Sequence, residues 1–234
     1  MPANTNHLLR TFGDVERRAL EPHLKSLELK QHDIIFDAHE AVAAVYFPID
    51  AVISLVVPLS TGEIIEAAMV GRDGVVAAGA ALDGRVSLNR AVVQIGGGSL
   101  ACSVEAFKSL FNDYPHIRAL IGAHEQALFA QAQQSAACNA THAIESRLAR
   151  WLLRAADLRG SQELPLTQEY IAEMLGVRRT SVTMVARTLQ NAGMITYTRG
   201  HITLANMQAL QDTACECYQT VKMNYDALLH ASNM

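Results

Sequence analysis

Basic and hydroxylated side chains gather in one stretch of the chain, residues 166–204, which reads LTQEYIAEMLGVRRTSVTMVARTLQNAGMITYTRGHITL. Guanidinium, hydroxyl and amide groups donate hydrogen bonds to phosphate oxygens and to the edges of bases. The candidate contact residues in this stretch are Thr167, Gln168, Arg178, Arg179, Thr180, Ser181, Thr183, Met184 and Arg187. Their types indicate a polyanionic partner, since the Arg fork matches phosphate geometry.

The elements that must position these residues are two short helices joined by a tight turn. Thr167 suits the N-cap of the first helix, and Gly176 suits the turn after it. The second helix is predicted over 179–191, because Val182, Val185, Ala186 and Leu189 recur at helical spacing. Alternation over 195–197 and 202–204, with Arg199-Gly200 between, predicts a β-hairpin. This order predicts a winged helix-turn-helix, whose second helix enters the DNA major groove; the alternative is a helical hairpin packed inside an enzyme.

The distribution of charge supports double-stranded DNA as the partner. The whole chain has a net charge of −4. Residues 140–205 hold eight Arg against five Asp or Glu, which is +3, and the remainder of the chain therefore carries −7. The positive charge lies around the predicted helix-turn-helix, where phosphates would bind.

The four cysteines, Cys102, Cys138, Cys215 and Cys217, do not form a usual metal-binding pattern. The Cys215-x-Cys217 spacing is tighter than that of common zinc sites, and no second pair accompanies it. If both stood on one helix, they would point in different directions. We therefore expect free thiols and no metal site.

Alternating short segments and turns predict a small β-roll between Leu27 and about Val104. The strands are expected at 33–36, 43–47, 52–58, 64–70, 90–95 and 99–102. An amphipathic helical segment over residues 5–24 is expected to precede the roll, with Asp14 as the cap of its second part after Gly13. A short helix is expected to lie across it at 75–82, and another is expected to follow it at 103–112.

A long helix is predicted to start near Pro115, which suits a first helical turn. Heptad spacing links Ile117, Ile121, His124, Leu128, Gln131, Ser135 and Cys138. These residues are predicted to form the seam of a homodimer; the alternative is that the helix packs on its own roll. Further helices are expected from Thr141 or His142 to Arg159, and from Asn206 to about Leu229.

The fold class is thus expected to be α+β, with two domains. Residues 1–139 form the β-roll sensor domain, which includes the dimerisation helix over about 115–138. Residues 140–234 form the winged helix-turn-helix domain.

This arrangement resembles the Crp/Fnr family of bacterial transcription regulators over nearly the whole chain. The resemblance is most specific in LTQEYIAEMLGVRRTSVT, in NAGMI and in the RGHIT wing turn. It implies a jelly roll of the cyclic-nucleotide-binding type, a homodimer, sequence-specific DNA binding and RNA polymerase as a partner. The family's opening Arg of the recognition helix is kept as Arg179, whereas Thr180 and Met184 replace the Glu and Arg of its best-known members, so we expect a different operator.

The resemblance places an effector site at Gly71, Arg72, Asp73, Gly74, Asn89 and Arg90. Members that bind cyclic AMP use a Glu where this chain has Arg72, and an Arg-Ser pair where it has Asn89-Arg90. We therefore expect no usual binding of cyclic AMP. The two Arg favour a larger or more charged anion, and the alternative is an internal pairing of Arg72 or Arg90 with Asp73 in a site that binds nothing. No Cys precedes Cys102, so the N-terminal iron–sulfur ligands of oxygen-sensing members are missing, while His32, His39, His116 and His124 leave haem ligation open.

Other classes of protein are less well supported by the sequence. A cupin-like metal oxygenase would need a His-x-His group with Glu and a further His, and residues 27–104 hold only His32 and His39. No nucleophile elbow or Walker loop occurs, so we expect no enzyme. A sensing or protein-docking module that does not read DNA sequence remains the alternative. No long apolar run and no signal-peptide pattern is present, so a cytoplasmic protein without a membrane partner or a fixed cofactor is expected.

Overall fold

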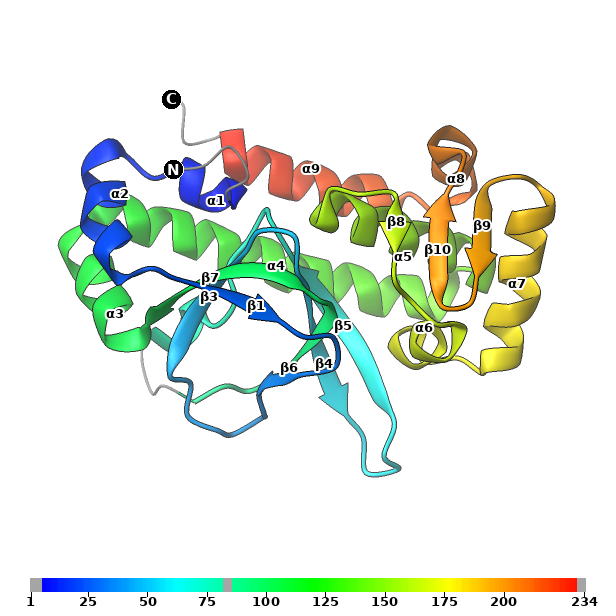
Figure 1. Cartoon of the computed structure of the whole chain (residues 1–234), viewed down its shortest axis with the longest axis horizontal. Helices are drawn as coiled ribbons and strands as arrows, with labels where there is room; N and C mark the ends of the chain where they lie inside the picture. Colours follow the sequence, from blue (N-terminus) through cyan, green and yellow to red (C-terminus); the bar gives the residue numbers. More distant parts are fainter. Residues whose placement is uncertain (1–5, 82–85, 231–234) are drawn as a thin grey trace.

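The computed structural model describes residues 6–81 and 86–230. Two antiparallel sheets form a β-roll at one end of the molecule, and a long helix, α4, runs behind them (Figure 1). The helix-turn-helix and a small wing lie at the other end. This is the α+β architecture predicted from the sequence.

The helical segment expected over residues 5–24 is divided at Gly13 in the part that the structure describes, as predicted, but Gly13 and not Asp14 is the N-cap of the second part. Helix α1 spans His7–Arg10, α2 spans Asp14–Leu20, and a 3-10 turn, η1, spans Glu21–His23. The break lies at Gly13, the N-cap of α2, whose N–H donates to Glu16 Oε2 at 2.6 Å. Asn6 caps α1 by accepting from the Leu9 N–H at 3.1 Å.

The β-roll consists of two antiparallel sheets that share one apolar core. One sheet has the order β1-β7-β3, and the other has the order β2-β6-β4-β5. The strands are β1 (Lys25–Leu29), β2 (Ile34–Phe36), β3 (Ala44–Pro48), β4 (Val52–Pro58), β5 (Ile64–Val70), β6 (Arg90–Ile95) and β7 (Gly97–Ser103). Alternate side chains such as Val45, Phe47 and Val93 are buried between the sheets. Strand β1 was not predicted, because it is largely exposed and lacks a full apolar face.

The helix predicted across the roll at 75–82 is a short 3-10 helix, η2 (Ala78–Ala81), and Leu82 lies outside the described residues. Helix α3 (Val104–Asp113) follows β7, with the Ser103 hydroxyl accepting from the Ala106 N–H at 3.2 Å.

Helix α4 (Pro115–Thr141) is the long helix predicted from the sequence, but the predicted dimer seam faces its own chain. Ile117 and Ile121 are fully buried in the core of the roll. His124 accepts from the Val75 N–H at 3.2 Å, and Gln131 donates to the Met69 carbonyl at 2.9 Å. The prediction of an intermolecular seam here is wrong, because intramolecular partners already satisfy both the apolar and the polar seam positions.

Helix α5 (Ile144–Arg159) links α4 to the helix-turn-helix end and starts slightly later than expected, after an extended Ala143. The helix-turn-helix consists of α6 (Gln168–Leu175) and α7 (Arg179–Asn191). The wing is a three-stranded sheet in the order β8-β10-β9, with β8 at Glu163–Leu164, β9 at Ile195–Thr198 and β10 at His201–Leu204. These elements share a second apolar core with α5, which includes the fully buried Leu164, Val182 and Leu204.

The C-terminal segment is helical over nearly the range expected, 206–229, and is divided into two helices, α8 (Met207–Thr213) and α9 (Cys217–His230). The chain bends at residues 214–216 between them. Helix α9 then runs back along α4 (Figure 1), and Val221, Tyr225 and Leu228 join the core of the roll. Among the residues described, no helix meets the length and hydropathy that a membrane span requires.

Candidate nucleic-acid interface

The turn between α6 and α7 holds the two helices in a fixed relation. The Thr167 hydroxyl accepts from the Tyr170 N–H at 3.2 Å and caps α6, as predicted. Gly176 ends α6 with a φ of +62°, a left-handed backbone that favours glycine. Arg147 on α5 donates to the Leu175 carbonyl at 2.5 Å and so satisfies an end of α6 from the neighbouring helix.

The residues predicted to contact DNA gather on the outer face of α7 and at the starts of α6 and α7. Val182 and Leu189 point inward with no exposure, while Met184 on the opposite face is 67% exposed. A shallow hollow on that face is lined by Arg179, Thr180, Thr183, Met184, Arg187, Thr188 and Asn191. Thr167, Arg178, Arg179, Thr180, Thr183 and Arg187 are exposed, whereas Gln168 and Ser181 are half-buried.

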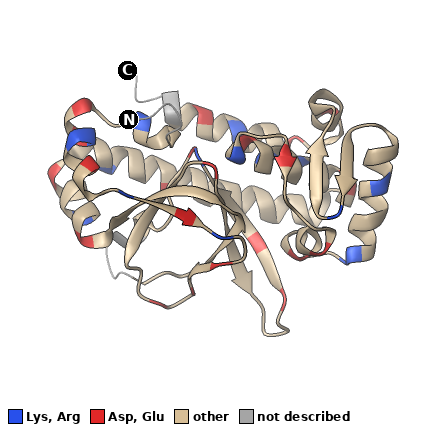
Figure 2. Ribbon diagram, in the orientation of Figure 1, with Lys and Arg blue, Asp and Glu red and all other residues tan. Residues whose placement is uncertain are grey.

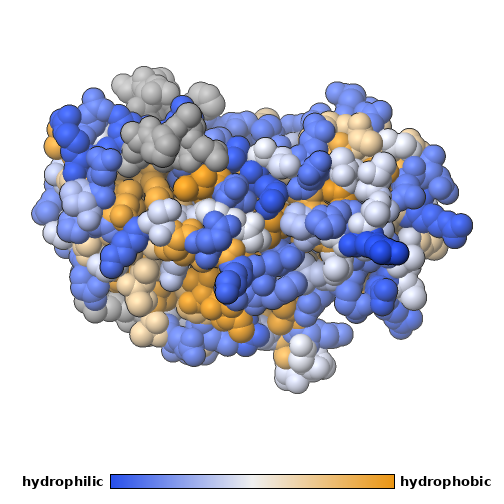
Figure 3. All heavy atoms as spheres, viewed as in Figure 1, coloured by the Kyte–Doolittle hydropathy of each residue, from blue (hydrophilic) through white to orange (hydrophobic). Residues whose placement is uncertain are grey.

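Two side-chain contacts tie the face of α7 to the start of α6. Arg179 Nη1 lies 3.1 Å from Glu169 Oε2, and both side chains are well exposed. The Thr183 hydroxyl donates to Gln168 Oε1 at 2.7 Å. Basic positions are marked in blue along the α7 ribbon (Figure 2). This end is mainly hydrophilic in the face shown in Figure 3, whereas hydrophobic residues gather over the roll. The Arg179 guanidinium is thus held at the surface by a weak, solvent-screened pair.

The wing adds a basic residue that was not included among the predicted contacts. Arg199 lies at the β9–β10 turn with a φ of +41° and is exposed. The next residue, Gly200, lies against Thr167, since a Cβ at Gly200 would be 3.5 Å from Thr167 Cγ2. The wing turn and the start of α6 therefore lie side by side. The Arg-Gly pair between two alternating strands was the available signal, and it was used only to predict the turn.

The six residues predicted for an effector site are divided between two places. Gly71, Arg72, Asp73 and Gly74 pack against the helices. A Cβ at Gly71 would approach Leu158 Cβ to 2.6 Å, and one at Gly74 would approach His124 Nε2 to 2.6 Å. The Arg72 guanidinium lies directly over Gly160, where a Cβ would collide with it. Asp73 pairs with buried Arg154 at 2.7 Å. Close packing against α4 and α5 thus explains the two glycines of this turn.

Asn89 and Arg90 lie at the other place, on the roll. Arg90 forms a two-pronged contact with Asp37, with N–O distances of 2.9 and 2.7 Å. Hydrogen bonding from this guanidinium holds the pKa of Asp37 below its ordinary value. Internal ion pairs were the alternative predicted for this region, with Arg72 or Arg90 as the partner of Asp73. The ion pairs observed are different: Arg90 pairs with Asp37, and Asp73 pairs with Arg154.

A pocket of about 270 Å³ lies between the roll, η2 and α4. Its described lining is mainly apolar, with Phe36, Leu55 and Leu128 among the larger side chains, and it also includes Ser87 and Asn89. Glu125 is the one charged residue among the described lining residues, and burial raises the pKa of its carboxyl. The described part of this pocket therefore favours an uncharged or apolar molecule over an anion.

Comparison with known proteins agrees with this geometry. Residues 146–213 match the model of the Crp-like helix-turn-helix domain. No curated protein sequence matches the chain. A Crp/Fnr-family regulator structure from Eubacterium rectale has a TM-score of 0.66 at 17% identity, over 88% of this chain and 96% of that chain. A CRP-family regulator from Thermus thermophilus has a TM-score of 0.66 at 20% identity, over 80% of this chain and 96% of that chain.

A third similar structure is that of CLP from Xanthomonas campestris, described as a c-di-GMP-responsive global regulator. It has a TM-score of 0.65 at 15% identity, over 82% of this chain and 99% of its own. The chain thus has the fold of Crp/Fnr transcription regulators. Within that fold, residues 146–213 form a Crp-like helix-turn-helix domain.

Proposed function

We propose that this protein is a sequence-specific DNA-binding transcription regulator that acts as a homodimer. The observation that carries the proposal is the exposed face of α7. Arg, Thr and Met side chains cover it, and a rigid, apolar inner face supports it. The N-terminal half of α7 enters the major groove, while Thr167, Gln168 and Arg187 contact phosphates. Arg199 on the wing contacts the backbone beside the start of α6.

The proposed dimer uses the face of α4 that points away from the roll. Seven exposed residues on this face recur at steps of three and four, namely Ala119, Gly122, Gln126, Phe129, Gln133, Ala136 and Ala140, and exposed Ala123 and Ala137 lie beside them. Small side chains let two helices approach closely, and Phe129, which is 66% exposed, supplies a large apolar contact. This face replaces the predicted seam as the contact between protomers.

The roll pocket beside Glu125 is the proposed site of effector binding, in place of the Arg72 and Arg90 pair. RNA polymerase is the proposed partner of the DNA-bound dimer, and the cytoplasm is its proposed location. A thermal-shift screen of uncharged small molecules tests the pocket on native protein and on the Arg90→Ala variant, and calorimetry with cyclic AMP, cyclic GMP and a cyclic dinucleotide gives the anionic comparison. We expect any binding to survive Arg90→Ala, because Arg90 is held by Asp37. Loss of nucleotide binding in the Arg90→Ala variant would show that Arg90 belongs to the effector site, as the sequence predicted.

The DNA-binding proposal is tested with a selection from randomised duplexes and with salt titrations of native protein and Arg187→Gln. An enriched operator with two related half-sites is the expected result. Arg187→Gln should weaken all sequences alike and lower the slope of log K against log salt by about one. If no DNA sequence is enriched and the protein binds another protein instead, the alternative of a protein-docking module would be favoured.

A further inference from the structure

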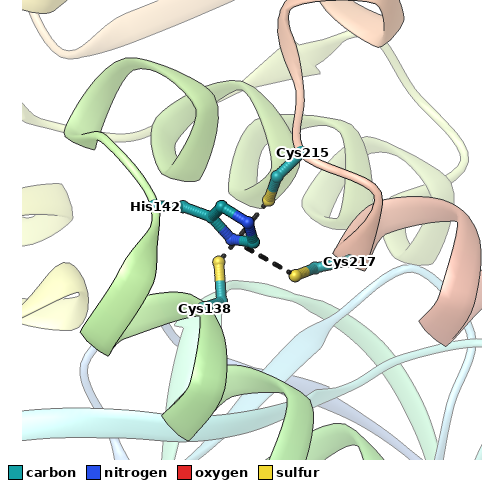
Figure 4. A group of neighbouring side chains, drawn as sticks. All are labelled: Cys138, His142, Cys215 and Cys217. Carbon is teal, nitrogen blue, oxygen red and sulfur yellow. Dashed lines mark hydrogen bonds between the residues drawn. The ribbon is translucent and has the colours of Figure 1, made fainter.

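Three cysteines and one histidine from distant parts of the sequence meet at the junction of α4, α5 and α9 (Figure 4). Cys138 lies in the last turn of α4, and His142 follows directly after that helix. Cys215 lies in the bend before α9, and Cys217 is the first residue of α9. Their three Sγ atoms and the His142 imidazole nitrogen all lie within 4.8 Å of one another.

The backbone explains why the two sequence arguments against a metal site do not hold. Cys215 and Cys217 do not share a helix, because α9 begins only at Cys217, and the bend turns both thiols toward the same point. The second pair of ligands is Cys138 and His142. Their spacing of four residues places them on one side of the α4 terminus. This pair was missed because one of its members is a His located 73 residues before Cys215.

We propose that Cys138, His142, Cys215 and Cys217 bind one Zn²⁺ ion per chain in a closed tetrahedral Cys₃His site. The Cys138 and Cys215 sulfurs are 3.5 Å apart, and Cys217 Sγ lies 3.5 Å from His142 Nδ1. Around one zinc ion, bond lengths of about 2.3 Å to sulfur and about 2.0 Å to nitrogen place neighbouring ligand atoms roughly 3.5–3.8 Å apart. These two pairs thus already have the spacing of neighbouring corners of such a tetrahedron, and the other pairs lie within 4.8 Å.

The surroundings orient these ligands as a metal site requires. His142 Nε2 lies 3.2 Å from Glu216 Oε1, so the carboxylate holds the ring with Nδ1 directed at the sulfurs. Gln134 Nε2 donates to Cys217 Sγ at 3.0 Å. Hydrogen bonds of this kind to the far nitrogen of a ligating His and to a ligating sulfur are the usual outer shell of a metal site.

The charge of the site is also balanced. Three thiolates, one neutral His and Zn²⁺ give a net charge of −1. The sulfurs are buried, with Cys138 and Cys217 fully so, and they form an apolar cluster separate from the two main cores. Arg147 and Arg150 on α5 are both 7% exposed and lie within electrostatic reach of Cys138. The Nε atoms of both have no hydrogen-bond partner among the described residues. An anionic zinc–thiolate centre would compensate this buried positive charge.

Two other uses of the thiols fit the arrangement less well. A Cys138–Cys215 disulfide would use only two of the four residues, and it would not explain why His142 lies between Cys217 and Glu216. An iron–sulfur cluster distributes its ligands over two or more irons, and ligands of different irons lie farther apart than four atoms grouped around one ion. Zinc bound here would join the end of α4 to the start of α9, at the point where α5 leads to the DNA-binding domain.

The full chain, purified without a metal-binding tag, tests the proposal by elemental analysis and by reconstitution with Co²⁺. We expect one equivalent of zinc per chain in the native protein. Cobalt should give the intense visible bands of tetrahedral coordination and a thiolate-to-metal charge-transfer band. Cys217→Ser and Cys138→Ser should each lose most of the bound zinc and alter the cobalt spectrum. Cys102→Ser, which removes a buried thiol in β7 outside the cluster, is the matched control and should retain both.

The visible spectrum of the cobalt-loaded native protein shows whether a tetrahedral thiolate site is present, even where a variant fails to fold. A chelator should remove the zinc and lower the melting temperature of native protein and of Cys102→Ser, and added zinc should restore it. Three results would overturn the proposal: native protein that takes up neither zinc nor cobalt under reducing conditions, native protein that carries the broad visible absorption of an iron–sulfur cluster, or cobalt bands that are unchanged in both cluster variants. These readouts involve no DNA, so they are independent of the proposed regulatory function.

Discussion

At the scale of single residues, Arg179 has the position predicted for a base contact and an exposed guanidinium in the structure. It opens the recognition helix, as expected, and its guanidinium is exposed beside Glu169. That pair must separate when Arg179 reaches a base, and an exposed pair of this kind opposes the separation by only about 1 kcal/mol or less. Arg179 is therefore available to read guanine through O6 and N7.

Arg179→Ala should weaken operator binding by about 1–3 kcal/mol and relax specificity at one base pair per half-site. Glu169→Gln is the matched control, since it releases Arg179 without removing it and should leave the base preference unchanged. A randomised-operator selection on both variants checks this. An unaltered preference in Arg179→Ala would assign base readout to another residue.

Two buried titratable residues give the stability of the protein opposing pH dependences. Burial raises the pKa of Glu66 to about 7, although Ser54 and Trp151 donate to its carboxylate. Burial lowers the pKa of His124 to about 4. The Glu66 contribution is present below about pH 4.5 and lost as pH rises through 7. The His124 contribution is present above about pH 6.5 and lost as pH falls through 4.

The two dependences nearly cancel in the native protein, because each corresponds to roughly 3 kcal/mol over its window. Glu66→Gln removes one of them. The free energy of unfolding of this variant should therefore rise more steeply between pH 4.5 and 6.5 than that of the native protein. Urea titrations across this range measure the difference. Parallel curves for the two proteins would mean that Glu66 does not hold its proton in the folded state.

At the scale of elements, α4 presents two faces with different roles. Its inner face, with Ile117 and Ile121, belongs to the core of the roll, and its outer face carries small residues and Phe129. A charge at Ile121 should therefore unfold the domain, instead of separating two protomers, because this side chain is buried in the core of its own roll. The protomer contact must be tested on the outer face.

Phe129→Glu should convert the proposed dimer into a monomer, because two like charges would face each other across the two-fold axis. The monomer should remain folded, since Phe129 is exposed within its own chain. Sedimentation velocity and circular dichroism measure the two properties. Met223→Glu on α9, at a site that is 61% exposed, is the matched control and should remain dimeric. A Phe129→Glu variant that stays dimeric would place the interface elsewhere.

At the scale of the whole molecule, one buried ion pair joins the roll to the C-terminal helices. Asp73 in the Gly71–Gly74 turn pairs with Arg154 on α5 at 2.7 Å. The Arg154 guanidinium also lies 4.5 Å from the ring centre of Tyr225 on α9. The Tyr225 ring packs in turn against His124 on α4, with centroids 6.1 Å apart. Four separate segments therefore meet around one guanidinium.

Arg154→Met should lower the free energy of unfolding by about 3–5 kcal/mol, because it leaves the Asp73 carboxylate buried without a partner. Arg17→Met, which breaks the exposed Arg17–Asp14 pair, is the matched control and should cost about 1 kcal/mol or less. Urea denaturation of both variants gives the comparison. Equal losses in the two variants would show that the Arg154 pair does not hold the domains together.

The sequence by itself determined the elements whose signals are local. The recognition helix over 179–191 and strands β4, β5 and β6 have the predicted bounds, because helical and alternating periodicity are properties of neighbouring residues. The N-cap at Thr167 and the turn at Gly176 depend equally on local backbone chemistry. These features were sufficient to predict a β-roll followed along the chain by a winged helix-turn-helix.

Only the tertiary structure decided which partner each side chain meets. Heptad spacing on α4 predicts a buried stripe, but it does not say whether the stripe faces a second copy of the chain or the roll of the same chain. In the structure the stripe packs against the roll of the same chain. Arg90 and Arg154 acquire their partners from residues 53 and 81 positions away. Cys138 and His142 meet Cys215 and Cys217 only because the chain bends before α9 and that helix then returns along α4. Contacts of this kind depend on chain topology, which local periodicity does not encode.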